Sequence, residues 1–208
     1  ELKAKELYED YRLYDAETLY YPAKDLIFYQ ADIHGNLLIR QRLQVIQALL
    51  ERKEVTIITS VGGCMDFLLP LGVFEKHCIH LRNDSEFDLD KIRKELVRLG
   101  YESTFQVEST GQFSVRGGIL DIYPLTEQNP IRIELWGDEI DSIRSFDAES
   151  QRSIENLEEI TIYPASELIL TENTIARGVK AIKKEAKKKV EKPKEEKKVT
   201  PQPKPNPQ

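Results

Sequence analysis

The stretches FSVRGGILDIYP, residues 113–124, and IRIELWGDEIDSIRSF, residues 131–146, decide the fold of the second half of the chain. Apolar and polar residues alternate along both, which is the pattern of strands that bury one face of a sheet. We therefore expect an antiparallel sheet across residues 113–143. A tight turn is expected at Gly137–Asp138, and a bulge or a close backbone approach at Gly117–Gly118.

The alternation also predicts which side chains face away from the core. Ile131, Ile133 and Leu135 share one face of their strand, while Arg132, Glu134 and Trp136 share the other. Arg116 faces outward on a neighbouring strand. An exposed tryptophan beside arginines is typical of protein–protein interfaces. Alternatively, Trp136, the only tryptophan, merely covers the end of the hairpin, and Arg132 pairs with a cross-strand acid such as Asp141. The pattern alone favours neither interpretation.

Short apolar runs alternate with helical patterns in the first half of the chain. The expected order is a helix over residues 1–14, a strand over 25–29, a helix over 37–50, a strand over 55–59, a helix over 65–69 and a strand over 78–81. Strands that alternate with helices indicate a parallel α/β sheet whose strands are buried on both faces. Further along, residues 87–99 are expected to form an amphipathic helix that ends at Gly100, and residues 160–163 a strand that could return to the first sheet.

These elements predict an α/β protein in which a small β-rich domain, of α+β type, is inserted into a partial parallel α/β layer. The expected divisions are 1–83 for the first part of the layer, 84–153 for the inserted domain, 154–170 for the return strand and 171–208 for a helix and a tail. The tail is rich in lysine and proline, so residues past about 190 are expected to be largely disordered.

Composition excludes several classes of protein. With 208 residues, 40% of them hydrophobic and 32% charged, a globular protein is expected. No apolar run reaches the roughly 18 residues of a membrane helix and no secretion signal is visible, so we expect a cytoplasmic protein without membrane contact. Cys64 and Cys78 are expected to be free, buried thiols. Three scattered histidines are too few for a metal site, and no metal is expected.

Charge is unevenly distributed, because residues 1–170 are acidic and residues 171–208 are basic. An acidic body is a poor match for a phosphate backbone, so nucleic-acid binding by the folded part is disfavoured. The basic tail is either a solvated tether, which we favour, or an arm that binds nucleic acid.

No catalytic constellation stands out. The phosphate-binding motif Gly-x-x-x-x-Gly-Lys-Ser/Thr is absent from the sequence, and Gly62–Gly63 lacks the lysine and the hydroxyl that such a loop needs. The carboxylate pairs Asp138–Glu139 and Glu158–Glu159 lack a partner of the opposite role for acid–base catalysis. We therefore predict no catalytic residue, no cofactor and no nucleotide site.

Several stretches resemble the transcription-repair coupling factor family, Mfd: the two quoted above, MDFLLP at 65–70, YPAKD at 21–25 and SQRS at 150–153. The excision-repair subunit UvrB shares the Arg-Gly-Gly ribbon and the hairpin, but SQRS resembles the coupling factors more closely. The resemblance, over residues 1–170, implies a UvrB-like shape in which the inserted domain binds the damage sensor UvrA and the α/β layer has lost its nucleotide loop. By resemblance, the positions that contact UvrA are Arg116, Arg132 and Trp136, the last a position where many relatives carry phenylalanine.

The resulting hypothesis is a monomeric, non-catalytic docking module that recruits UvrA to stalled transcription complexes in nucleotide excision repair. RNA polymerase and DNA would be bound only through domains absent from this chain, as would the ATP-dependent translocase of the family. The alternative is a fragment of a UvrB-like, ATP-dependent DNA repair protein, against which the missing phosphate loop argues.

Overall fold

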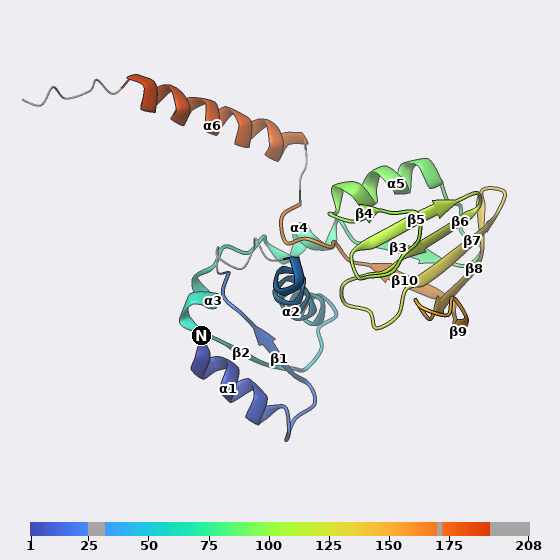
Figure 1. Cartoon of the computed structure of the whole chain (residues 1–208), viewed down its shortest axis with the longest axis horizontal. Helices are drawn as coiled ribbons and strands as arrows, with labels where there is room; N and C mark the ends of the chain where they lie inside the picture. Colours follow the sequence, from blue (N-terminus) through green and yellow to red (C-terminus); the bar gives the residue numbers. More distant parts are fainter. Residues whose placement is uncertain (25–31, 170–171, 192–208) are drawn as a thin grey trace, which may run out of the picture. The chain divides into compact units, whose positions relative to one another are not determined.

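The computed structural model describes residues 1–24, 32–169 and 172–191 (Figure 1). The chain divides into two units, residues 1–169 and 170–208. In the second unit the described part is the helix α6, Glu172–Glu191, which confirms the helix expected there. The strand expected at 25–29 and the tail from residue 192 onward lie outside the described residues.

A two-stranded parallel sheet lies in the first half of the chain. β1, Thr18–Tyr21, pairs with β2, Thr56–Thr59, and Thr18 stands opposite Thr56. The helices α1, Leu2–Tyr11, and α2, Asp32–Leu50, contact these strands. Both helices and β2 lie where the sequence predicts them, whereas β1 lies where the pattern predicts no element.

Two short helices replace the single helix expected at 65–69. They are α3, Val61–Met65, and α4, Leu71–Glu75. The Ser60 hydroxyl caps α3 by accepting a hydrogen bond from the Gly63 amide at 3.2 Å, so the helix begins earlier than predicted. The backbone of Asp66 is extended, and Pro70 disfavours a helical residue before it. The prediction at 65–69 is therefore wrong.

β3, Ile79–Arg82, and β10, Glu159–Ile162, form an antiparallel pair in which Ile79 stands opposite Ile162. Both strands lie where the sequence predicts them. β10 thus pairs with an element of residues 1–83, but not with the parallel pair β1–β2. Among the described strands, the parallel sheet contains β1 and β2 without the third strand expected at 78–81. That expectation is wrong because the backbone groups of β3 find their partners in β10.

Six strands form the largest sheet, in the order β4-β5-β6-β7-β8-β9 (Figure 1). Their bounds are β4, Glu102–Ser103; β5, Gln112–Arg116; β6, Ile119–Ile122; β7, Ile131–Trp136; β8, Glu139–Phe146; and β9, Ser153–Leu157. Neighbours from β5 to β9 pair antiparallel, which confirms the predicted antiparallel sheet. β4 pairs with β5 in parallel.

One face of this sheet is buried against helix α5, Leu89–Arg98. Phe113 and Ile133 from the strands and Leu96 from the helix are fully buried in the same cluster. The Asp88 carboxylate caps α5 by accepting a hydrogen bond from the Lys91 amide at 3.0 Å. The helix ends just before Gly100, as predicted, and begins at Leu89, two residues later than predicted.

The turns of the sheet match the predictions in part. Gly117–Gly118 is the turn between β5 and β6 rather than a bulge, and the Leu135 amide donates to the Gly118 carbonyl at 2.8 Å. The predicted close backbone approach is therefore confirmed. Gly137 begins the predicted turn between β7 and β8 with a φ of 65°, in the left-handed region that favours glycine. The bulge lies in β8, at Asp141, because Glu134 pairs with Ser142 and Leu135 with Ile140.

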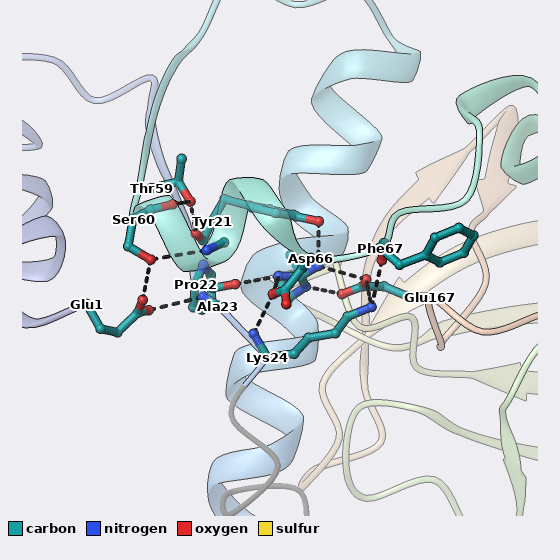
Figure 2. A network of polar contacts seen from close by, with 12 residues as sticks. Glu1, Tyr21, Pro22, Ala23, Lys24, Thr59, Ser60, Asp66, Phe67 and Glu167 are labelled. Carbon is teal, nitrogen blue, oxygen red and sulfur yellow. Dashed lines mark hydrogen bonds and ion pairs between the residues drawn. The ribbon is translucent and has the colours of Figure 1, made fainter.

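A buried polar network ties the first part of the chain to residue 167 (Figure 2). Arg42 of α2 donates hydrogen bonds to the Pro22 carbonyl, the Tyr21 hydroxyl, Asp66 and Glu167. These partners come from three separate places in the sequence, residues 21–22, Asp66 and Glu167, so one side chain fixes their relative positions.

The chain is thus a mixed α/β protein with several sheets, as predicted. The domain boundaries at 83/84, 153/154 and 170/171 stay predictions. Within the described ranges, no helix combines the length and the apolarity that crossing a membrane requires.

The two cysteines differ in exposure. Both are free, but Cys64 is exposed and Cys78 is half-buried, so the expectation of buried thiols is wrong for Cys64. Its position on the short helix α3, at the surface, explains the difference. Burial, followed by the charge of Glu75, raises the pKa of the Cys78 thiol to about 11.

This difference predicts selective labelling. Because the thiolate is the reactive form, a thiol reagent at pH 8 should modify Cys64 quickly and Cys78 at least about tenfold more slowly. The measurement is the time course of disulfide exchange with a chromogenic reagent. Cys64→Ser should remove the fast phase, and two equal rates in the unmodified chain would contradict the prediction.

Candidate protein interface

The face of the six-stranded sheet opposite α5 carries the sequence-predicted residues. We call it the outer face. Across β5 to β8, Ser114, Asp121, Arg132 and Arg144 stand opposite one another in one row. Arg116, Ile119, Glu134 and Ser142 form the next row. In the first row, strand register therefore places polar side chains from four strands side by side.

Asp121 lies at the centre of this arrangement and is 1% exposed. Its carboxylate accepts two hydrogen bonds from Arg132, from Nε at 2.6 Å and from Nη2 at 2.8 Å. It accepts a third from Nη2 of Arg116 at 2.6 Å. We call Arg116, Asp121 and Arg132 the Asp121 cluster. It combines two guanidinium groups with one carboxylate, so its formal charge is positive.

Arg132 is held from three sides. Besides Asp121, its guanidinium lies over the Phe146 ring at 4.4 Å and donates to the Gln151 side-chain oxygen at 3.0 Å. Gln151 adopts a φ of 59° within a turn in which the Asp147 carboxylate accepts a hydrogen bond from the Ser150 amide at 2.7 Å. The hydrogen bonds to Asp121 raise the pKa of Arg132. Gln151, from the SQRS stretch, thus contacts this arginine directly.

The structure corrects the expected exposure of Arg132. Its direction is as predicted, but only 15% of the side chain is exposed, against 39% for Arg116. Arg132 does pair with an acid on a neighbouring strand, as the alternative interpretation proposes, but the acid is Asp121 of β6 and not Asp141. Asp141 is the bulge residue of β8, outside the regular register with β7.

Trp136 is the most exposed of the three predicted residues, at 83%. It ends β7 beside the turn to β8, and residues 84–87 hold this end of the hairpin. The Phe87 amide donates to the Asp138 carbonyl at 2.8 Å, and the Ile140 amide to the Ser85 carbonyl at 3.0 Å. Within the described part of the chain, the indole forms no hydrogen bond or ring contact. Its exposure argues against a mere covering role at the hairpin end.

The structure thus brings Arg116 and Arg132 together on one carboxylate, while Trp136 lies four residues along β7 from Arg132. At about 3.3 Å per residue, the two Cα atoms are about 13 Å apart. The outer-face row between them holds Glu134, which pairs with Arg144. Sequence reasoning overlooked Asp121. The signal was a single acid within the apolar strand at 119–122.

No metal site is found in residues 1–24, 32–169 and 172–191, where no group of three or more histidine, cysteine, aspartate or glutamate side chains could hold an ion.

Comparison with known proteins finds a family model that matches this sheet. The model of the UvrB interaction domain matches residues 79–168. The matched range comprises the six-stranded sheet, α5 and the β3–β10 pair, and therefore the Asp121 cluster and Trp136.

Relatives extend the similarity to most of the chain. A transcription-repair-coupling factor from Bacillus subtilis (strain 168) is 39% identical over 170 residues, which are 82% of this chain. One from Staphylococcus aureus (strain USA300) is 40% identical over 163 residues, or 78% of the chain. The predicted resemblance to these coupling factors is confirmed. The chain spans 14% of the length of each of these relatives.

Proposed function

We propose that this chain is a non-catalytic docking module for UvrA within a transcription-repair coupling factor. The observation that supports the proposal most is the outer face of the UvrB interaction domain. There, Arg116 and Arg132 bind the carboxylate of Asp121, and the exposed indole of Trp136 lies on the same sheet. Arginine and tryptophan are the side chains that most often anchor protein interfaces. In this role the chain recruits UvrA to stalled transcription complexes for nucleotide excision repair.

The chemistry of the outer face favours a protein partner over nucleic acid. Residues 1–170 are acidic, so they repel a phosphate backbone, and the Asp121 cluster supplies only a local positive charge. A complementary surface needs acceptors for Arg116 and an apolar side chain for Trp136. We propose a UvrB-like layout for the chain, and contacts with RNA polymerase and DNA only through other parts of the full protein.

Arg116→Ala tests the interface with little risk to the fold. Because the Arg116 side chain is 39% exposed and has one partner, its removal should leave the melting temperature nearly unchanged. Affinity for purified UvrA should fall about five- to tenfold if its guanidinium contacts the partner. Titration of the fluorescently labelled chain with UvrA measures this change.

The matched control is Arg93→Ala, which removes the same charge from an exposed position on α5, on the opposite side of the sheet. It should bind UvrA like the unmodified chain. Equal affinities for Arg116→Ala and Arg93→Ala would refute the assignment of Arg116. Failure of the unmodified chain to bind UvrA at all would refute the proposed function.

A further inference from the structure

We propose that Asp121 is the positioning residue of the docking surface, holding Arg116 and Arg132 in the geometry that the partner meets. The inference rests on the proposed function and adds a residue to it. Asp121 is 1% exposed, so it offers almost no surface to a partner. Its effect on binding would pass through the two arginines.

Strand register explains how one acid serves both arginines. Asp121 of β6 stands directly opposite Arg132 of β7, and the guanidinium binds both carboxylate oxygens. Arg116 lies one outer-face position further along β5 and reaches back to the oxygen that also accepts from Arg132 Nη2. The two arginines thus lie on strands separated by β6 and are joined only through the carboxylate.

Ordering these side chains before binding should increase affinity. An arginine has several rotatable bonds, and fixing them during association opposes binding. Asp121 fixes them in the free chain, and the Phe146 ring and Gln151 add to this for Arg132. Two guanidinium groups on one carboxylate also leave a net positive charge on the outer face, and Arg116 is the more exposed of the two arginines. Asp121 thereby sets both the orientation of the arginines and the local charge of this face.

A purely structural role for Asp121 makes a different prediction. A buried carboxylate that lost its charge would leave two guanidinium groups without their anion, and the fold would lose stability whatever the arginines do in binding. Glu167 provides the comparison, since it is also a buried carboxylate bound to an arginine, Arg42, in another part of the same unit. A positioning residue affects the affinity of the folded chain, whereas a structural one affects only the folded fraction.

The experiment measures UvrA affinity for Asp121→Asn and Glu167→Gln at a temperature where both variants are folded by circular dichroism. Asp121→Asn should weaken binding about tenfold, because two arginines lose their orientation, and Glu167→Gln should bind like the unmodified chain. In combination with Arg116→Ala, the losses should be less than additive, since both changes remove the same ordered guanidinium. Unchanged affinity of folded Asp121→Asn, or fully additive losses, would overturn the inference.

A second measurement needs no partner. Relaxation of the arginine Nε–H groups in a ¹⁵N-labelled chain should show Arg132 as rigid in the unmodified protein and mobile in Asp121→Asn. Equal mobility would overturn the positioning role even if UvrA binding had failed. If Asp121→Asn does not fold, Asp121→Glu keeps the charge but displaces the carboxylate by one methylene, and the same two results are expected of it.

Discussion

Replacing Trp136 by alanine should weaken UvrA binding by about 2 kcal/mol, roughly thirtyfold at 25 °C. Because 83% of the residue is exposed, the indole contributes little to the core, and the free energy of unfolding should stay within about 0.5 kcal/mol of its original value. If the indole is an interface anchor, its burial under the partner is the largest apolar gain that this face can offer. Isothermal titration with UvrA and a urea denaturation curve measure the two quantities.

Two controls make the result specific. Trp136→Phe keeps an aromatic ring at the position and should retain most of the affinity. Phe67→Ala removes another exposed aromatic side chain, 76% exposed, which lies after α3 and outside residues 79–168, the range that the UvrB interaction domain model matches. It should not change the affinity. A Trp136→Ala variant that binds as tightly as the unmodified chain would remove Trp136 from the interface.

The side-chain directions on the outer face were largely predictable because β7 alternates without interruption. Period-two alternation places Ile131 and Ile133 inside and Trp136 outside, and the bulge at Asp141 leaves the alternation of β7 intact by placing the extra residue in β8. The alternation predicts which face of the sheet a side chain points to, but not whether another segment packs over it and buries it. Arg132 points outward and is still mostly buried, because the turn carrying Gln151 packs over it.

Long-range pairing was not predictable from local pattern. The sequence of β3 predicts a strand, but nothing in its four residues indicates that β10, about 80 residues later, is its partner. β1 is short and follows a turn, so its pairing with β2 decides its structure more than its own composition does. Asp121 was overlooked for a related reason. A lone acid in an apolar strand is unremarkable until the arginines of both neighbouring strands are seen to converge on it.

The buried network around Arg42 predicts the largest loss of stability. Arg42 is 2% exposed, and Figure 2 shows its partners Tyr21, Pro22, Asp66 and Glu167 together with Lys24. Its guanidinium also lies 4.0 Å from the centre of the Tyr21 ring. Burial raises the pKa of Tyr21 to about 12, so its hydroxyl stays protonated at neutral pH while its oxygen accepts from Arg42. Burial alone would lower the pKa of Arg42, but the hydrogen bond to Glu167 and the charges of Glu167, Tyr21 and Asp66 together outweigh this effect, so the pKa of Arg42 is raised.

Arg42→Met should therefore lower the free energy of unfolding by about 3–5 kcal/mol, because it leaves Glu167 buried with Lys24, at 2.8 Å, as its remaining ion-pair partner. Urea denaturation followed by circular dichroism measures the loss. Adding Glu167→Gln should recover part of it, since a buried amide costs less than a buried unpaired carboxylate. A double variant as unstable as the sum of the two single variants would show that Arg42 stabilises the fold by packing, with no coupling to Glu167. An Arg42→Met variant of unchanged stability would contradict the prediction entirely.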